Sequence, residues 1–483
     1  MNNKRILSTL LLMTTLLSSC ASGGAENETT TDGDTGTGTG AETTDPLYAD
    51  LPAGDFGGET LKLLGENMTT WAIIELCADE LDGDLINDTM YAIDRRVEDK
   101  LNIKISAEYR PASGELRDVV NTAMMSGDDE YDVYDIPSHI ATGLILKDSF
   151  RPISELEGIS SDKPWWDENI RETLTFDGKC YSLLGDVSLM LGEAHLVMYL
   201  NKDIADTLGL EDHYELVRSG KYTLDRLGED VRAAALDLNG NGETDFDDRF
   251  GACTSARVMT YLMISGEEPI VQTGNDGLPY FEGLSEKAVD MFGKIKSFMF
   301  DKSLTIVEGS RLVPSDKIWQ SPFLEGRSLY MFEPLGYTKL MRDLDFDYAV
   351  LPMPKYDEAQ KEYLTPVLQY VHTMYVTKVN GNTKLIGTAL ENLSAESYKE
   401  LRPAYFETVL NNKRVRDDES IEMLDIIFAN RVLNPLTIFD WGGLSGTLNQ
   451  KAQGTSDNIV SDIAKSTPRI QSEIEKTVEY YRQ

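Results

Sequence analysis

The sequence predicts an α/β protein of two lobes, each a mostly parallel sheet flanked by helices, joined by crossing hinge strands. A chain of 483 residues is too long for one ordinary core. Strand-like and helix-like segments alternate in its first part, which is typical of parallel sheets. A strand-like run at His195–Leu200 follows a turn and precedes a helix cap, between two such regions. These three observations favour two α/β lobes with a crossing point near residue 195.

The first lobe is expected at residues 56–190, with a return segment at about 364–420. Its alternating pattern predicts strands at Thr60–Leu64, Ile103–Tyr109 and Tyr131–Ile136, and helices at Asn87–Leu101 and Leu116–Met125. Asn87 or Asp88 is expected to cap the first helix. Ligands of such sheets bind beyond the carboxyl ends of the strands. The candidate ligand-binding residues there are Asn67, Trp71, Ser138 and His139, although each is also consistent with an ordinary solvated loop.

Leu184–Asp203 is predicted to carry the chain from the first lobe to the second. Asn201 or Asp203 is well placed to cap the helix that follows. The segment Tyr363–Tyr375 is expected to return toward the first lobe and to run beside it. Four polar or aromatic residues of these two segments are therefore candidate ligand-binding residues, namely Asp186, Glu193, Gln369 and Tyr370.

The second lobe is expected at residues 191–363, with C-terminal helices at about 421–483. Predicted elements are helices at Thr223–Ala235 (capped by Thr223) and Ala288–Met299, and strands at Ser328–Phe332 and Phe346–Pro354. Glu333 follows a strand and is a candidate ligand-binding residue. Trp441, in a Gly-rich loop, is either an aromatic platform or a packing residue. The pair Trp165 and Trp166 could stack on a sugar ring, but such pairs more often fill a core.

Residues 237–248 have the spacing of an EF-hand calcium loop. Oxygen-bearing side chains occupy loop positions 1, 3, 5, 9 and 12, a Gly occupies position 6, and position 7 offers its carbonyl. The expected ligands are Asp237, Asn239, Asn241, Glu243, Asp245 and Asp248. Asp248 departs from the usual Glu at position 12, and a turn rich in acids that needs no metal is the alternative. One structural calcium ion is the cofactor expected, with no organic cofactor.

The amino terminus is typical of an exported lipoprotein. Residues 1–20 combine a basic flank, a short apolar run and the sequence LSSC, which resembles a lipobox, so Cys20 is the expected lipidation site. Residues 21–55 are rich in Gly, Thr and acids and are expected to form a disordered linker. The expected location is the extracellular face of the cell membrane, with the body held there by the lipid anchor.

Charge and cysteine content exclude several classes of protein. A net charge of −37 argues against a nucleic-acid partner, since phosphate binding needs clustered Lys and Arg. Beyond Cys20 three cysteines remain, Cys77, Cys180 and Cys253. Because three is an odd number, at least one of them should be free. The favoured interpretation is that these cysteines act as small buried hydrophobic residues.

Several segments resemble the extracellular solute-binding lipoproteins of bacterial ABC importers, in particular their carbohydrate-type, family 1-like members. The resemblance covers nearly all of the chain after about residue 55. It is carried by the order of KPWWDENI, FDGKCYSLLGD, MYLNKDIADTLGL, YELVRSGKYTLDRL, DLNGNGETDFDDRFG, FLEGRSLYMFEPL, AVLPMPKYDEAQKEY, LENLSAESYKELRPAYFE and RDDESIEMLDIIF. Tyr222 departs from the Trp that is usual there. The resemblance implies a periplasmic-binding-protein-like fold that closes over a ligand by hinge motion and delivers it to permease subunits.

The function expected from these observations is capture of a sugar or oligosaccharide by a monomer without enzymatic activity. An oligopeptide-type binding protein is an alternative, because a sugar is favoured over a peptide by resemblance alone. A secreted glycoside-active enzyme is a second alternative, since two carboxylates suffice for that chemistry. A chain with 82 acids always offers such pairs, and no hydrolase or nucleotide-binding motif is evident. An adhesin or scaffold is disfavoured because internal repeats are absent.

Overall fold

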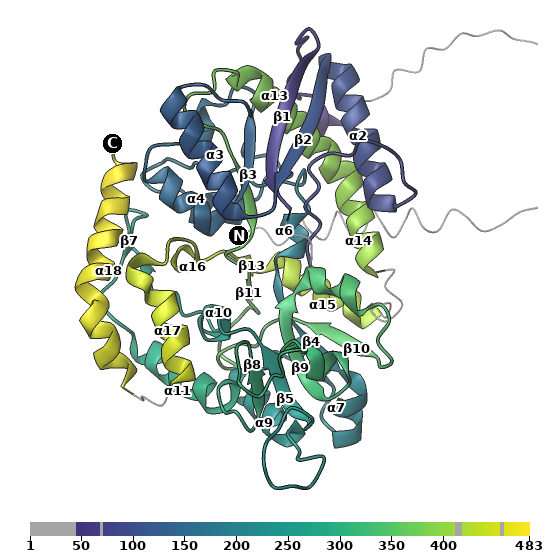
Figure 1. Cartoon of the computed structure of the whole chain (residues 1–483), viewed down its shortest axis with the longest axis vertical. Coiled ribbons are helices and arrows are strands. Elements are labelled where there is room, and N and C mark those ends of the chain that lie inside the picture. Colours follow the sequence, from purple (N-terminus) through teal and green to yellow (C-terminus); the bar gives the residue numbers. More distant parts are fainter. Residues whose placement is uncertain (1–44, 68–70, 411–417, 455–457) are drawn as a thin grey trace, which may run out of the picture. The chain divides into compact units, whose positions relative to one another are not determined.

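The computed structural model of the chain describes residues 45–67, 71–410, 418–454 and 458–483. By its internal contacts the chain divides into Met1–Ala49 and Asp50–Gln483. In the first unit, Asp45 caps a short 3-10 helix η2 (Pro46–Tyr48). The predicted signal peptide, Cys20 and most of the predicted linker lie outside the described residues. The second unit holds both large sheets (Figure 1).

The first sheet has the strand order β12-β3-β1-β2. Its strands are β1 (Glu59–Glu66), β2 (Ile103–Arg110), β3 (Val133–Pro137) and β12 (His372–Tyr375). β1 pairs in parallel with β2 and β3, while β12 pairs antiparallel with β3. The helices that pack on this sheet or beside it are α2 (Leu85–Leu101), α3 (Ser113–Ser126), α4 (Ser138–Ile145) and α13 (Thr383–Glu396). The predicted alternation of strands and helices is confirmed, and the return segment supplies the edge strand β12.

The predicted cap of α2 is wrong. The helix begins two residues earlier than expected, and Asp84 caps it by accepting hydrogen bonds from the backbone N–H groups of Ile86 and Asn87. Gly83 has a φ of 87°, a left-handed conformation that places Asp84 at the cap. Asn87 and Asp88 therefore lie within the first turn of the helix.

The second sheet has the order β10-β4-β9-β5-β8 and is half antiparallel, unlike the mostly parallel sheet expected. Its strands are β4 (Leu196–Asn201), β5 (Phe250–Thr254), β8 (Thr305–Val307), β9 (Ser328–Pro334) and β10 (Tyr348–Leu351). β5, β8 and β9 run in parallel and end on the side where β4 begins, because β4 enters directly from the crossing segment. Leu196 at the start of β4 accordingly pairs with Pro334 at the end of β9.

Helices cover the second sheet as the sequence predicts. Around it lie α7 (Lys202–Leu208), α8 (His213–Arg218), α9 (Leu224–Ala234), α10 (Val258–Ser265), α11 (Glu286–Met299) and α12 (Ser321–Leu324). The Asn201 side chain caps α7 and the Thr223 side chain caps α9, so both predicted caps are confirmed. A hairpin of β6 (Gln272–Thr273) and β7 (Pro279–Tyr280) lies apart from the main sheet.

Two antiparallel segments join the lobes, and we call them the crossing segments: residues 183–195 and 367–374. Leu183 exchanges backbone hydrogen bonds with Met374, and His195 forms a bridge with Val367. The first crossing segment contains the short helix α6 (Met190–Glu193). The predicted partnership between the crossing run and the return strand is therefore confirmed.

The remaining helices contact both lobes. They are α5 (Glu168–Thr173), α14 (Arg402–Leu410), α15 (Asp418–Ala429), α16 (Pro435–Phe439), α17 (Leu444–Gln453) and α18 (Ile459–Tyr481), with β11 (Thr365–Pro366) paired to β13 (Arg431–Val432). α15 packs on β10 of the second sheet, whereas α16 packs on α4 and α14 on α2. The C-terminal part was expected with the second lobe alone.

Among the described residues, no helix combines the length and the apolarity needed to cross a bilayer.

Candidate functional site

The carboxyl ends of three parallel strands place polar side chains at one edge of the second sheet. Thr254 of β5 is paired with Val307 of β8 and with Phe332 of β9. The residues just beyond these positions therefore lie at the same sheet edge: Arg257 three residues after β5, Glu308 directly after β8, and Glu333 near the end of β9. This is the edge at which ligands of α/β sheets bind.

Aromatic and amide groups from the first lobe and the return segment complete this edge. His139, in the first turn of α4 beyond β3, contacts Tyr370 edge-to-face, with ring centroids 5.1 Å apart. Its Nδ1 lies 3.1 Å from the carbonyl oxygen of Gln369. The guanidinium of Arg257 lies over the ring of Tyr370, 5.2 Å from the centroid. Tyr370 therefore links a first-lobe side chain to a second-lobe side chain.

Glu333 is the most deeply buried acid of this group. It accepts a hydrogen bond of 2.7 Å from Gln320 Nε2, which lies 3.3 Å from the hydroxyl of Tyr337. Tyr337 belongs to the 3-10 helix η4 (Leu335–Met341) directly after β9. We call the whole set the strand-end cluster; its members are His139, Arg257, Glu308, Gln320, Glu333, Tyr337, Gln369 and Tyr370.

The electrostatics of the strand-end cluster hold two ionisable side chains in their neutral forms. Burial raises the pKa of Glu333 to about 8, and the charge of Glu308 adds to this rise while hydrogen bonds from Gln320 and Tyr337 oppose it. At pH 7 the carboxyl is thus mostly protonated and can donate as well as accept a hydrogen bond. Burial also lowers the pKa of His139, with Arg257 adding to the effect, so this imidazole is neutral as well.

Of the ten residues predicted to bind ligand, the structure brings four into the strand-end cluster, namely His139, Glu333, Gln369 and Tyr370. Ser138 is fully buried and donates its hydroxyl to the carbonyl of Val371, which ties the return segment to α4. Asn67 is exposed, and its backbone N–H is bound to the carbonyl of Arg110. Trp441 is 2% exposed, stacks on Phe439 and donates its indole N–H to Thr477. Trp441 therefore lies in the packing position that the sequence left as its alternative.

Glu193 and Trp71 meet at Gly336, on η4. A Cβ at position 336 would lie 2.2 Å from Glu193 Oε2 and 2.2 Å from the Trp71 carbonyl, so only glycine fits. Glu193 is 3% exposed, and burial raises its pKa to about 7. It lines a pocket with a cavity volume of about 340 Å³, together with Lys339, Arg342 and several residues between Ile73 and Met90. Glu193 is thus separated from the strand-end cluster by η4.

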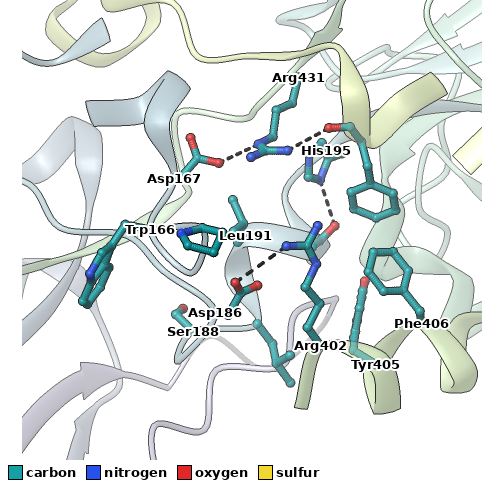
Figure 2. A pocket seen from close by; sticks show the side chains of 14 residues that line it. Trp166, Asp167, Asp186, Ser188, Leu191, His195, Arg402, Tyr405, Phe406 and Arg431 are labelled. Carbon is teal, nitrogen blue, oxygen red and sulfur yellow. Dashed lines mark hydrogen bonds and ion pairs between the residues drawn. The ribbon is translucent and has the colours of Figure 1, made fainter. Parts of the chain in front are cut away.

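Asp186 lies elsewhere, in a pocket beside the first crossing segment (Figure 2). Its carboxylate is paired with Arg402 of α14 at 3.7 Å. Trp166 lines the same pocket and donates its indole N–H to Glu391, whereas Trp165 is 1% exposed and packed. The pair of tryptophans therefore contributes to packing, with one ring reaching a pocket wall.

The predicted calcium loop is an exposed turn at residues 237–248, held by its own side chains. Asp237 accepts hydrogen bonds from the N–H groups of Gly240 and Gly242, and Asp248 accepts from those of Leu238 and Asp245. The amides of Asn239 and Asn241 both donate to Asp245. Within the described residues, no group of three or more His, Cys, Asp or Glu side chains is arranged to hold a metal ion.

The three cysteines of the body, Cys77, Cys180 and Cys253, are free, which confirms that at least one is unpaired.

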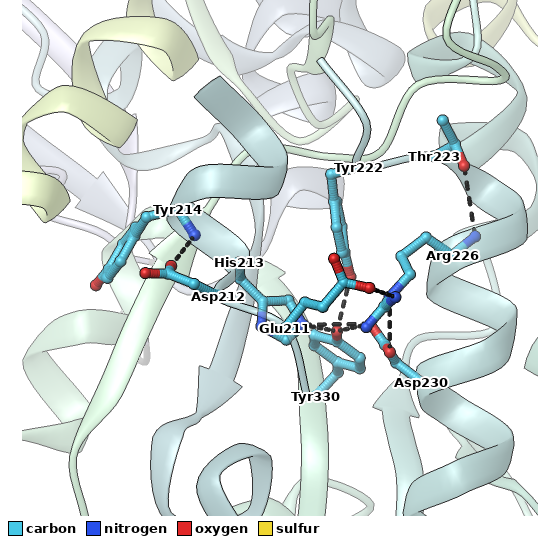
Figure 3. Close-up of polar contacts among 9 residues, drawn as sticks. All are labelled: Glu211, Asp212, His213, Tyr214, Tyr222, Thr223, Arg226, Asp230 and Tyr330. Atoms are coloured by element: carbon cyan, nitrogen blue, oxygen red, sulfur yellow. Dashed lines mark hydrogen bonds and ion pairs between the residues drawn. The ribbon is translucent and has the colours of Figure 1, made fainter. Parts of the chain in front are cut away.

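A second polar network is buried inside the second lobe, away from the strand ends (Figure 3). Asp230 of α9 accepts a hydrogen bond from the Tyr330 hydroxyl at 3.0 Å and is paired with Arg226 at 3.0 Å. Tyr222 donates to Tyr330 at 2.8 Å, and His213 Nε2 lies 2.8 Å from the same hydroxyl. These contacts tie α8 and α9 to β9. We call this set the α9 network; it includes Tyr222, the position at which the resembled family usually has Trp.

Four members of the strand-end cluster were missed from the sequence: Arg257, Glu308, Gln320 and Tyr337. The strands β5 and β8 that position two of them are five and three residues long. The apolar run FGACT after the predicted calcium loop was the available signal for β5. Had it been assigned as a strand, the rule on strand ends would have indicated Arg257.

Comparison with known proteins identifies the fold. No family model and no curated protein matches the sequence. Solved structures do match: a sugar transporter protein of Rhizobium etli in an open conformation has a TM-score of 0.56 at 14% identity, over 88% of this chain and 99% of that one. A cyclo/maltodextrin-binding protein complexed with maltotetraose has a TM-score of 0.55 at 15% identity, over 88% and 97%. An ABC substrate-binding protein of Listeria monocytogenes in complex with cycloalternan has a TM-score of 0.54 at 13% identity, over 87% of this chain and 99% of that one. The chain therefore has the two-lobed fold of periplasmic binding proteins.

Proposed function

We propose that this protein is an extracellular solute-binding protein that captures an oligosaccharide and delivers it to the permease of an ABC transporter. The observation that carries the proposal is the strand-end cluster, in which aromatic rings, carboxyls, amides and a guanidinium meet where the two lobes face the return segment. Sugars are typically held by aromatic faces and by such hydrogen-bonding groups. The similar solved structures include proteins described with maltotetraose and with cycloalternan, which supports an oligosaccharide rather than a peptide.

The cluster suits a neutral polyhydroxylated ligand. Tyr370 and Tyr337 are half-buried and offer rings with an accessible part. Glu333, mostly protonated at pH 7, and the amide of Gln320 can each donate and accept hydrogen bonds with sugar hydroxyls, while Arg257 donates. Binding and release need no covalent chemistry here, and motion about the two crossing segments would open and close the site.

Delivery requires that the protein stay near the membrane. We propose that Cys20 carries the lipid anchor and that residues 21–55 act as a flexible tether at the extracellular face of the membrane. Labelling with a palmitate analogue should modify the wild-type chain and not Cys20→Ser, whereas Cys77→Ser should be modified like the wild type. Labelling that persists in Cys20→Ser would contradict the anchor.

The test of capture is calorimetric titration of the soluble body with maltotetraose and a panel of other oligosaccharides, combined with chromatography of the sugars after overnight incubation. Capture predicts saturable heat with at least one oligosaccharide and full recovery of that sugar. Shorter products would favour the glycoside-active enzyme, for which Glu308 and Glu333 would be the carboxyls to test first. Heat with oligopeptides but with none of the sugars would favour the peptide-binding class.

We also propose that residues 237–248 bind one structural calcium ion through Asp237, Asn239, Asn241, Asp245, Asp248 and the carbonyl of Glu243. The supporting observation is that oxygen atoms of five side chains on one short loop, at the spacing of a calcium loop, accept hydrogen bonds from backbone N–H groups of that same loop. Calcium should raise the melting temperature of the wild-type protein and leave that of Asp237→Asn/Asp245→Asn unchanged. Equal shifts in both proteins would contradict this site.

A further inference from the structure

A pocket with a cavity volume of about 340 Å³ lies beside η4, and we call it the η4 pocket. The first lobe contributes residues between Ile73 and Met90, from the segment after β1 and the start of α2. The second lobe contributes η4 and Arg342, and Glu193 of α6 and Tyr405 of α14 also line the pocket. A cavity of ~150 Å³ admits benzene, so this one has room for a molecule of roughly ten heavy atoms.

The two lobes contribute opposite charges to the η4 pocket. Glu75 and Asp82 of the first lobe are exposed, whereas the second lobe supplies Lys339 and Arg342. Asp84 lines the pocket as well, but its carboxylate already caps α2. Among the described residues, neither Lys339 nor Arg342 forms an ion pair. The two cations of this pocket therefore have no carboxylate partner within the chain that the structure describes.

Lys339 lies near two acids of the pocket without pairing with them. It is half-buried, and burial lowers the pKa of its ammonium group, while the charges of Glu193 and Glu75 oppose that fall. Both acids are therefore close enough to act on Lys339 through space but too far away to form an ion pair with it. Such a gap leaves room for a ligand that carries one charge for each side.

Glu193 adds a buried carboxyl to the acidic side of the η4 pocket. It is 3% exposed, and burial raises its pKa to about 7, against the attraction of Lys339, so the carboxyl is about half ionised at pH 7. Its Oε2 has no hydrogen-bond partner of good geometry among the described residues. A cation in the pocket would stabilise the ionised form of this carboxyl.

The first-lobe side of the η4 pocket also has an apolar part, formed by Ile73, Ile86 and Met90. A neutral sugar would leave the charges of the pocket without partners. An amino acid carries an ammonium group and a carboxylate on the same carbon atom, and an apolar side chain would be removed from water against the isoleucines and the methionine. A zwitterion of this kind matches all three features of the pocket.

We propose that the η4 pocket is a second ligand site, which binds a free amino acid with an apolar side chain. The carboxylate of the amino acid pairs with Lys339 and Arg342, and its ammonium group pairs with Glu75. Its side chain packs on Ile73 and Met90. The site is separated from the strand-end cluster by η4, and binding there does not depend on the function proposed for that cluster.

The probe is L-leucine, titrated into the soluble body by calorimetry, and saturable binding is expected. Three analogues test the three contacts in the unaltered protein. Isocaproate lacks the ammonium group of leucine, isoamylamine lacks its carboxylate, and L-alanine lacks its branched apolar part. Each analogue should bind about tenfold or more weakly than leucine, because each loses one of the contacts.

Variants test the two charged sides of the η4 pocket. Lys339→Gln and Glu75→Gln should each weaken leucine binding by about tenfold or more, since each replaces a charged partner by a neutral amide. Lys302→Gln is the matched control, because Lys302 is exposed in the same lobe as Lys339 and does not line the pocket. It should bind leucine like the wild type. Circular dichroism checks that each variant is folded.

Tyr370→Ala separates the two sites. It should bind leucine as the wild-type protein does, even where it has lost its oligosaccharide. The proposal is overturned if leucine gives no saturable heat, if any of the three analogues binds as tightly as leucine, or if Tyr370→Ala abolishes leucine binding. It is also overturned if either Lys339→Gln or Glu75→Gln binds leucine as Lys302→Gln does.

Discussion

The α9 network and the strand-end cluster are both polar groups inside the second lobe, yet they differ in how fully their members are paired. In the α9 network, Asp230 is 1% exposed, and its carboxylate is bound by Tyr330 and Arg226. In the strand-end cluster, Arg257, Gln369 and Tyr370 are partly exposed. A network whose members satisfy one another fixes a fold. Side chains that a sheet edge holds in place, but whose hydrogen-bonding groups and rings are not fully occupied by neighbours, are free to bind a ligand.

The largest effect that this comparison predicts is on stability, from Asp230→Ala. The change leaves Arg226 and the Tyr330 hydroxyl without the buried carboxylate that both contact, and it should lower the free energy of unfolding by about 3–5 kcal/mol. Urea denaturation measures it. The control is Asp225→Ala on the same helix, whose side chain is 66% exposed, with an expected change of about 0.5 kcal/mol or less. A loss under about 1 kcal/mol for Asp230→Ala would contradict a structural role for the network.

The next effect is on binding, from Tyr370→Ala. Removing the ring that joins His139 to Arg257 should weaken oligosaccharide affinity by about tenfold to a hundredfold, or ~1.4–2.7 kcal/mol. Calorimetric titration measures it. Tyr280→Ala is the matched control, because Tyr280 is 42% exposed in the separate β6–β7 hairpin, and its affinity should stay at the wild-type value. Equal affinities in both variants would place the ligand elsewhere.

A third effect is the pH dependence contributed by Glu333. Its pKa is raised to about 8 in the folded protein, so the folded state holds a proton that the unfolded state has released. The stability contribution therefore falls as pH rises from about 5 to about 8, by at most about 1.4 kcal/mol per pH unit. Glu333→Gln should lose less stability than the wild-type protein over this range, as measured by urea denaturation at a series of pH values. Parallel curves for the two proteins would mean that Glu333 is ionised when folded.

The smallest effect is expected from Tyr222→Phe. It removes one hydroxyl of the α9 network but leaves Tyr330 bound to Asp230 and close to His213. The free energy of unfolding should fall by about 1 kcal/mol. Affinity for the oligosaccharide should not change, and a change in affinity would show that the network and the strand-end cluster are coupled.

Local signals in the sequence were sufficient for much of the fold. The caps at Asn201 and Thr223 are confirmed because a capping side chain acts within three residues of its own position. The direction of β4 depends instead on a crossing segment that joins two lobes, and the pattern of a strand carries no direction. The second sheet was for this reason expected to be mostly parallel and is half antiparallel.

Residues of the candidate site could be predicted where the strand that precedes them could be predicted. His139 and Glu333 follow strands that the pattern of apolar residues identifies, and both lie in the strand-end cluster. Arg257 and Glu308 follow β5 and β8, whose five and three residues are too short to show a periodicity. Asp186 and Glu193 were expected at one cleft, but a crossing segment turns its side chains to different sides, and they line two separate pockets.

Calorimetric titration of the wild-type body and of Tyr370→Ala with maltotetraose and the other oligosaccharides of the panel tests the central claim most directly. Saturable binding by the wild-type protein, an affinity about tenfold or more lower in the variant, and unaltered sugar after the titration are the results expected of capture at the strand-end cluster. Absence of heat with every oligosaccharide, or release of shorter sugars, would contradict it.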